Sequence, residues 1–198
     1  MKKKVKIIQI LSVLIIGVVS NQALAQENNK KMKLIQAGYE MVVNVTPEKA
    51  WETLAIYGDI ATYHDGVVSS ESLNDTNNIA QLGCDRICHL DNGKRKVMVK
   101  EKIIDFSEGN YYTYEVYDWE NFPLKTMFNT FGVKTNSNGE TVIYQTTKYR
   151  LKPRFLTWFM KGKIKSNARI AMMSYKHYME TGEKKTSVDI LKKKYKHL

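Results

Sequence analysis

The residues of this chain best suited to chemistry are an arginine and a glutamate on neighbouring segments with strand-like alternation. Arg86 alternates with Cys84 and Cys88, and Glu101 alternates with apolar residues such as Val99. Because cysteine is usually buried and every second strand residue shares a face, Arg86 and Glu101 are predicted to point inward. A buried charge without a partner is strongly destabilising, so we expect these two side chains to form an ion pair.

This pair has two interpretations. A fixed salt bridge needs no ligand, whereas a polar anchor would orient one end of a small molecule in an otherwise apolar pocket. The other inward faces are too polar for a dry core, which favours the pocket. Its predicted lining residues are Arg86, Cys88, Val99, Glu101, Tyr112, Tyr114, Gln145 and Tyr149 on strands, and Phe159, Met160 and Met172 on a long helix. The helix residues would equally suit plain helix-on-sheet packing.

A catalytic interpretation uses the same carboxylate. In a cyclase or dehydratase, Glu101 would act as an acid or base with His64 or a tyrosine, within hydrogen-bond reach of the reacting atom. His64 lies in a predicted loop, however, where histidines are more often solvated surface residues. Non-catalytic binding is therefore favoured, and no catalytic residue is assigned.

A metal site built from Cys84, Cys88, His64 and His89 is disfavoured. The Cys-x-x-x-Cys spacing differs from the two-residue spacing of zinc knuckles, and His89 should point away from Cys88 in a strand. In a strand the two cysteines would lie roughly 13 Å apart, too far for a disulfide, although a helix would bring them together. We expect buried thiols and neither a metal nor a cofactor.

The elements that position these residues begin with a strand over 33–45 and a helix over 47–57. Thr46 can cap the helix with its hydroxyl, and Pro47 suits the first helical position. Trp51 lies on the inner face of this helix and is interpreted as core packing. The strand therefore turns sharply into the helix.

The rest of the predicted order is a short helix, antiparallel strands and a long helix. The short helix covers 59–63. Turn residues such as those of Asn136–Gly139 separate strands over 67–73, 84–90, 96–106, 111–119, 126–134 and 142–151. The long helix covers 156–179 with one broad apolar stripe, and a short amphipathic helix is predicted around 188–195.

Four segments resemble a known family: TPEKAWETLAIYGDIATYHDGVVSSESL, GCDRICHLDNG, VKEKIIDF and YTYEV. They are similar to the polyketide cyclase/dehydrase and lipid-transport family of the START-like, Bet v 1-like (SRPBCC) superfamily, over roughly residues 35–180. The resemblance implies an α+β helix-grip fold, in which a curved antiparallel sheet wraps a long C-terminal helix and encloses an apolar cavity with small helices at its mouth. Family members often carry Trp and Pro where this chain has Tyr63-His64-Asp65.

The resemblance also implies a class of function. Some members of this superfamily cyclise polyketides, and many only bind or carry a hydrophobic ligand, without a shared catalytic set. Arg86 and Glu101 fall on positions that resemble the family's cavity-facing polar groups. The expected partner is a small hydrophobic molecule or lipid, with a cyclase-type enzyme as the alternative.

The N-terminus has the pattern of a cleavable signal peptide. Four lysines within Lys2–Lys6 precede an apolar run over 7–19 and the small residues Ala23-Leu24-Ala25. The apolar run, of about 13 residues, is shorter than the roughly 20 needed to span a bilayer. The chain is expected to be exported, to the periplasm or the medium, in four parts: a signal peptide over 1–25, a flexible lead over 26–32, the START-like domain over 33–182 and a basic tail over 183–198.

The chain is basic, with 31 Lys and Arg against 20 Asp and Glu. No nucleic-acid motif accompanies this charge, and export separates the protein from most nucleic acid, so no nucleic-acid partner is expected. Lys161, Lys163, Lys165 and the tail could make peripheral contact with an anionic membrane. The oligomeric state is not predicted.

Overall fold

The computed structural model describes residues 33–74, 77–91 and 96–197, and the statements below refer to these residues. The predicted signal peptide over 1–25 and the lead over 26–32 lie outside them. Within the described part, no helix is long and apolar enough to cross a membrane.

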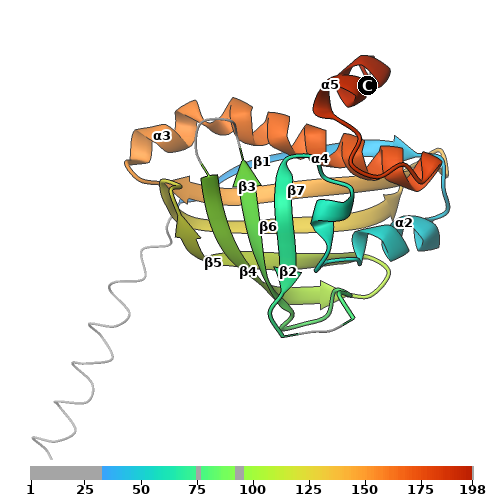
Figure 1. Ribbon diagram of the computed structural model, residues 1–198. Helices are drawn as coiled ribbons and strands as arrows, with labels where there is room; N and C mark the ends of the chain where they lie inside the picture. Colours follow the sequence, from blue (N-terminus) through green and yellow to red (C-terminus); the bar gives the residue numbers. More distant parts are fainter. Residues whose placement is uncertain (1–32, 75–76, 92–95, 198) are drawn as a thin grey trace, which may run out of the picture. The chain divides into compact units, whose positions relative to one another are not determined.

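The strands form one antiparallel sheet of seven in the order β1-β7-β6-β5-β4-β3-β2 (Figure 1). Their bounds are β1 Ile35–Val43, β2 Val67–Ser72, β3 Asp85–Asp91, β4 Lys96–Ser107, β5 Tyr111–Glu120, β6 Leu124–Thr135 and β7 Thr141–Leu151. All seven predicted strands are confirmed, with ends shifted by at most two residues. For β3 to β7 the agreement follows from short polar links between segments with period-two alternation, which favour hairpins between consecutive strands, whereas β1 pairs with β7 at the edge of the sheet.

Helix α2 spans Pro47–Leu54 and begins as predicted, since the Thr46 hydroxyl accepts a hydrogen bond from the Lys49 amide at 3.3 Å. It ends three residues before the predicted end at 57. The chain leaves the helix there because its backbone bonds to a distant segment: the Ala80 amide donates to the Ala55 carbonyl at 2.7 Å, and the Gly58 amide donates to the Asn78 carbonyl at 3.1 Å. The short helix η1 follows at Ile60–Thr62.

The predicted single helix over 156–179 is wrong in one respect, because two helices occupy this stretch. Helix α3 spans Arg154–Phe159 and helix α4 spans Lys161–Thr181, with Met160 at the junction. Gly162 lies beside the break, where its low helix propensity weakens a continuous helix. Helix α4 ends at Thr181 and is capped by Gly182, whose φ of 74° is the left-handed conformation that glycine adopts readily.

Helix α5, Val188–Lys194, follows closely the short helix predicted over 188–195. The Ser187 hydroxyl caps it, and Leu191 and Tyr195 are buried. The Tyr195 hydroxyl lies 3.2 Å from Nδ1 of His177 on α4, which ties the two helices together. The basic tail is therefore partly a docked helix.

Helix α4 lies across one face of the curved sheet (Figure 1), and the main hydrophobic core lies between them. The strand faces predicted from alternation are confirmed, because one set of residues is buried on each strand: Cys84, Arg86 and Cys88; Val97, Val99, Glu101 and Ile103; Tyr112, Tyr114 and Val116; Ile143, Thr147 and Tyr149. This arrangement is the predicted α+β helix-grip fold.

Candidate functional site

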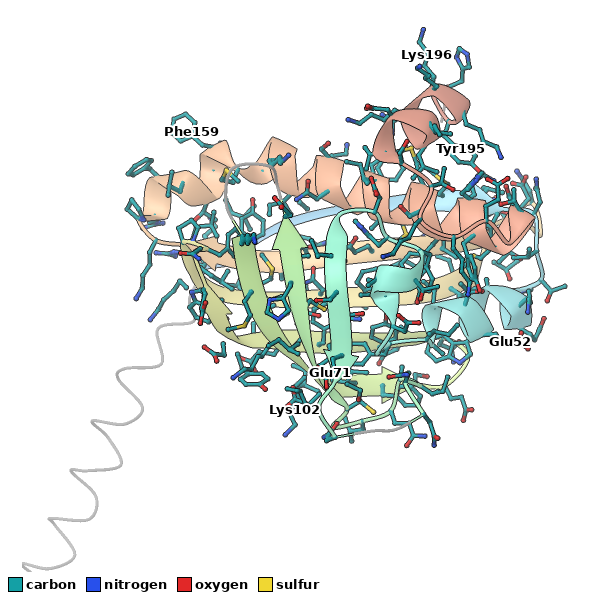
Figure 2. The ribbon with its side chains drawn as sticks, in the orientation of Figure 1. Glu52, Glu71, Lys102, Phe159, Tyr195 and Lys196 are labelled. Carbon is teal, nitrogen blue, oxygen red and sulfur yellow. The ribbon has the colours of Figure 1, made fainter. Side chains whose placement is uncertain are left out.

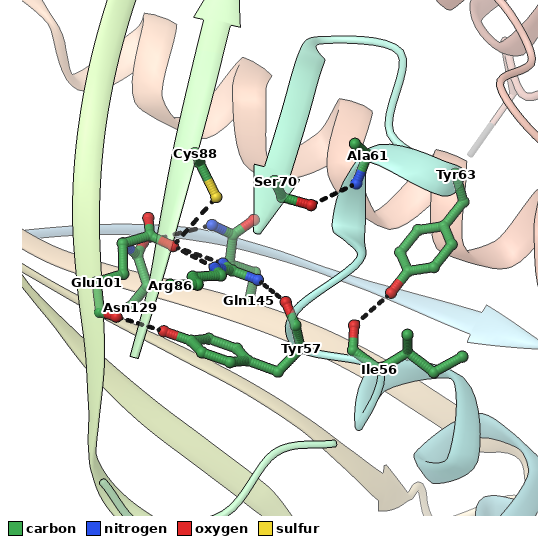
Figure 3. Close-up of polar contacts among 10 residues, drawn as sticks. All are labelled: Ile56, Tyr57, Ala61, Tyr63, Ser70, Arg86, Cys88, Glu101, Asn129 and Gln145. Atoms are coloured by element: carbon green, nitrogen blue, oxygen red, sulfur yellow. Dashed lines mark hydrogen bonds and ion pairs between the residues drawn. The ribbon is translucent and has the colours of Figure 1, made fainter. Parts of the chain in front are cut away.

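The expected ion pair lies in the interior of the domain (Figure 3). Strands β3 and β4 place Arg86 directly opposite Glu101. Arg86 Nε donates to Glu101 Oε2 at 2.6 Å, and its Nη2 lies 2.6 Å from the same oxygen. Arg86 is 1% and Glu101 6% exposed. Burial, the largest single influence, lowers the pKa of Arg86, but the Glu101 carboxylate together with Cys88, Tyr57 and Tyr114 raises that pKa well above its ordinary value, so the guanidinium stays charged.

Tyr57 encloses the pair from the other side. Arg86 Nη1 donates to the Tyr57 carbonyl at 2.5 Å, and the guanidinium lies 4.0 Å from the centre of the Tyr57 ring. The Tyr57 hydroxyl donates to the Glu101 backbone carbonyl at 2.9 Å. The ring of Tyr114 lies 5.1 Å from the guanidinium. Arg86 is thus held by hydrogen bonds and by two aromatic faces.

Cys88 is the third polar side chain at the pair. Its Sγ lies 3.9 Å from Glu101 Oε2. Burial raises the pKa of Cys88 to about 12, so the group remains a thiol. The contacts from Arg86 and Cys88 all reach Oε2, and Glu101 Oε1 receives none of them. Cys84 is also a buried thiol, as predicted.

Three buried polar atoms of this interior have no hydrogen-bond partner of ordinary geometry within the described part of the chain, although the Tyr112 and Tyr175 hydroxyls are close enough to shift one another's pKa. They are the hydroxyl oxygens of Tyr112 and Tyr175 and Oε1 of Gln145. Tyr112 and Gln145 come from strands β5 and β7, and Tyr175 comes from α4. The three atoms therefore come from both the sheet and the helix that enclose the interior. Burial is the main cause that raises the pKa of both tyrosines well above the ordinary value. Both therefore remain neutral hydroxyl groups that can donate or accept.

Aromatic rings fill the space around these atoms. Tyr112 stacks with Phe131 at a centroid distance of 5.7 Å, Phe131 contacts Tyr175 at 5.9 Å, and Tyr63 contacts Tyr175 at 5.0 Å. Two open hollows of about 320 and 700 Å³ lie over β1, β6 and β7, and the lining of the larger one includes Gln145 and, from α4, Lys165. The apolar interior implied by the family resemblance is therefore occupied by side chains in this structure.

The remaining predicted lining residues divide into three groups. Val99, Tyr149 and Met172 are buried, and Gln145 is half-buried with Nε2 at 3.4 Å from Asn129 Oδ1. Met160 is half-buried. Phe159 does not lie inside, because it is 79% exposed. Neighbouring residues of a helix point about 100° apart, so Met160 and Phe159 cannot both face the sheet.

His64 does not lie on the solvated surface, where loop histidines are usually found. It is half-buried after η1, and its Nδ1 accepts a hydrogen bond from the Gly66 amide at 3.0 Å. Burial lowers the pKa of His64 to about 4, so the ring is neutral near pH 7. His89 is exposed on the face opposite Cys88, and no three His, Cys, Asp or Glu among the described residues are grouped to hold a metal.

Sequence reasoning missed Tyr57, Tyr63 and Asn129. Asn129 accepts a hydrogen bond from the Thr147 hydroxyl at 2.6 Å, and it shares the inward face of β6 with Met127. Strand alternation could have found Asn129. Nothing in the sequence marks the roles of the two tyrosines, because they depend on where the segment after α2 runs.

Comparisons with known proteins agree with this architecture. The family model described as polyketide cyclase / dehydrase and lipid transport matches residues 35–180. No curated protein matches the chain.

Several solved structures are similar in fold. The crystal structure of Ara h 8.0201 has a TM-score of 0.60 and 16% identity, covering 74% of this chain and 98% of that chain. The Zhui aromatase/cyclase from Streptomyces sp. R1128 has a TM-score of 0.60 and 12% identity, covering 76% and 98%. XoxI from Bacillus cereus has a TM-score of 0.57 and 14% identity, covering 73% and 94%. At these identities the likeness extends to the fold.

Proposed function

This chain belongs to the polyketide cyclase/dehydrase and lipid transport family, and on that premise we propose that it binds a small, largely hydrophobic ligand between the sheet and α4. The supporting observation is the set of buried polar atoms with unused hydrogen-bonding capacity on Tyr112, Gln145 and Tyr175. Buried polar atoms are nearly always hydrogen-bonded in native proteins, so three in one interior suggest a bound molecule that supplies the partners.

The charges of the site indicate an uncharged polar end on this ligand. Arg86 and Glu101 neutralise one another, and further groups hold Arg86 in place. A charged group on the ligand would lose its hydration and find no free counter-charge in the site, which would make its binding unfavourable. Gln145 Oε1 and Glu101 Oε1 can accept hydrogen bonds, and the tyrosine hydroxyls can donate them. A ligand with hydroxyl and carbonyl groups at one end of an apolar body fits this set.

Ligand entry requires the aromatic rings to move. Tyr63, which follows η1, contacts Tyr175 and stacks with Tyr178 on α4 at 5.2 Å. Tyr63 directly follows η1, so a shift of η1 away from α4 would move the Tyr63 ring with it. This movement would uncover Tyr175. The packed interior then corresponds to the closed state of a binding protein.

Binding is better supported than acid/base catalysis. Glu101 is held by contacts from Arg86 and Cys88, which oppose its movement toward a substrate. His64, the other suggested partner, has a pKa of about 4 and uses Nδ1 to accept a backbone hydrogen bond. Glu101 is thus fixed in place by its contacts, and His64 is not poised for proton transfer near pH 7.

The first test uses protein purified from its own host. Native mass spectrometry should detect a copurifying neutral, oxygenated and apolar molecule. Binding of this molecule, or of 2-naphthol as a fluorescent probe, is then compared between the wild type and Tyr175→Phe. Loss of one hydrogen bond should weaken binding roughly fivefold.

The matched control is Tyr117→Phe, because Tyr117 bonds to Asp85 on the outer surface. It should leave affinity unchanged. Equal affinity for wild type and Tyr175→Phe, together with protein free of any bound molecule, would contradict the proposal.

We also propose that residues 1–25 are a cleaved signal peptide and that the protein acts outside the cytoplasm. The basic start, the apolar run over 7–19 and Ala23-Leu24-Ala25 support this. Intact-mass measurement of protein recovered from the periplasm or the medium should give a chain that begins at Gln26. Uncleaved protein in the cytoplasm would contradict it.

A further inference from the structure

Helix α3 presents three large apolar side chains to solvent. Phe155, Trp158 and Phe159 are 60%, 78% and 79% exposed. Their spacing of three and four residues places them on one side of the helix, and the rings of Phe155 and Phe159 contact one another at 6.2 Å. We call these three residues the α3 face. Exposed aromatic residues grouped in this way mark an interaction surface more often than single exposed ones do.

The opposite side of α3 is anchored to the sheet. Thr157 is buried, its hydroxyl accepts a hydrogen bond from the Leu151 amide at 3.0 Å, and its carbonyl accepts one from the Tyr149 hydroxyl at 2.9 Å. Leu156 and Met160 pack against the core. With this side fixed, the helix cannot turn the α3 face inward without breaking these contacts. The exposure of the three rings is therefore built into the fold.

The segments of the chain on either side of the α3 face carry charge of one sign. From Thr141 to Met179 the sequence contains nine Lys and Arg and no Asp or Glu. Arg154, Lys161, Lys163 and Lys165 are exposed on and just after α3. Such a surface attracts an anionic partner, and it repels a second copy of this chain, whose net charge is also positive.

Aromatic rings flanked by lysine and arginine match the chemistry of an anionic bilayer surface. Tryptophan and phenylalanine partition into the boundary between headgroups and acyl chains, while the long cationic side chains reach the lipid phosphates. We propose that the α3 face docks the domain on an anionic lipid bilayer, with Arg154, Lys161 and Lys163 contacting the headgroups. This docking does not depend on the proposed ligand site.

The lysines near the C-terminus provide a second contact. Figure 2 shows Phe159 at one end of the helical layer and Lys196 at the top of α5, which lies over α4, and both project away from the sheet. Tyr195 lies against α4 between Arg169 and His177, so the helix separates the two regions by roughly 15–27 Å. Two contacts at this separation would orient α4 along the membrane.

The first test measures whether Trp158 enters the lipid. The full chain is mixed with vesicles of phosphatidylcholine and phosphatidylserine that carry a brominated phosphatidylcholine as a fluorescence quencher. Trp51 and Trp119 are half-buried, so the difference in quenching between the wild type and Trp158→Phe isolates Trp158. We expect quenching of Trp158 that decreases at high salt and without phosphatidylserine. Equal quenching of both proteins would overturn the proposal, and a protein partner would then be the better occupant.

The second test compares matched variants by vesicle cosedimentation. Lys161→Gln should weaken binding roughly fivefold, and Phe159→Ser about tenfold. The controls are Lys102→Gln and Leu82→Ser, which alter an exposed lysine and a 69% exposed leucine outside the α3 face. Residues 1–25 are identical in all variants, so their contribution cancels. Equal losses in variants and controls, or equal binding to neutral vesicles, would overturn the proposal.

Discussion

The buried ion pair can be tested most sharply by removing its members singly and together. Arg86→Met leaves Glu101 as an unpaired charge in a site that is 6% exposed. Breaking a buried pair from one side typically costs about 3–5 kcal/mol of the free energy of unfolding. For a domain of this length, each kcal/mol lowers the melting temperature by about 2–4 °C, so a decrease of roughly 6–20 °C is expected.

The double variant Arg86→Met/Glu101→Met isolates the interaction between the two side chains. Replacing both charges by apolar groups of similar volume is often close to neutral, so the double variant should be more stable than Arg86→Met alone. The contact between Arg86 and the Tyr57 carbonyl is lost in both proteins and cancels from the coupling energy. We expect a coupling energy of about 3 kcal/mol or more.

The assay is urea denaturation followed by circular dichroism for the wild type, both single variants and the double variant. The control is Lys49→Met, because Lys49 and Glu52 form an exposed pair whose side chains are 61% and 64% accessible. This change should cost about 0.5 kcal/mol or less. If Arg86→Met costs no more than Lys49→Met, or if the single effects simply add, the pair does not stabilise the domain as described.

Three other predictions follow from local geometry. Gly38→Ala should lower the free energy of unfolding by about 1–3 kcal/mol, because a Cβ would lie 2.4 Å from the Gln145 carbonyl oxygen. The control Gly162→Ala has open space around the added Cβ and should be neutral or stabilising, so equal effects of the two changes in urea denaturation would contradict this reasoning. The His64 ring should titrate near pH 4 by NMR, well below its ordinary pKa of 6.5. Between these two values the unfolded chain binds more protons than the folded one, so the free energy of unfolding should fall as the pH decreases from about 6.5 to about 4. His64→Gln should make this dependence of stability on pH less steep. Cys88 should resist a thiol reagent near pH 8 in the folded protein and react after denaturation, since its pKa is about 12; rapid labelling of the folded protein at this residue would contradict its burial.

The sequence alone determined the order of the elements and the inward faces of the strands. Period-two alternation is a local property, so Arg86 and Glu101 could be placed on facing inner positions without a structure. Antiparallel pairing of consecutive strands then made their ion pair a direct expectation. The signal for α2 was equally local, because Thr46 and Pro47 define its start through cap geometry.

Predictions that depended on rotation about a helix axis were less successful. The apolar stripe over 156–179 predicts one continuous helix, but the break at Met160 and the anchoring of Thr157 set the rotation of α3. Phe159 consequently faces solvent. A helical pattern with aromatic residues on several sides does not specify which side packs on the sheet.

Only the tertiary structure decided what surrounds the ion pair. Tyr57 reaches Arg86 because the backbone after α2 bonds to residues 78–80, a long-range contact that no local pattern encodes. The unused hydrogen-bonding capacity of the Tyr112 and Tyr175 hydroxyls likewise results from packing α4 against β5 and its neighbours. Local sequence determines which side chains face inward, whereas the fit of distant elements determines which of them touch, which remain without partners and whether a cavity is open.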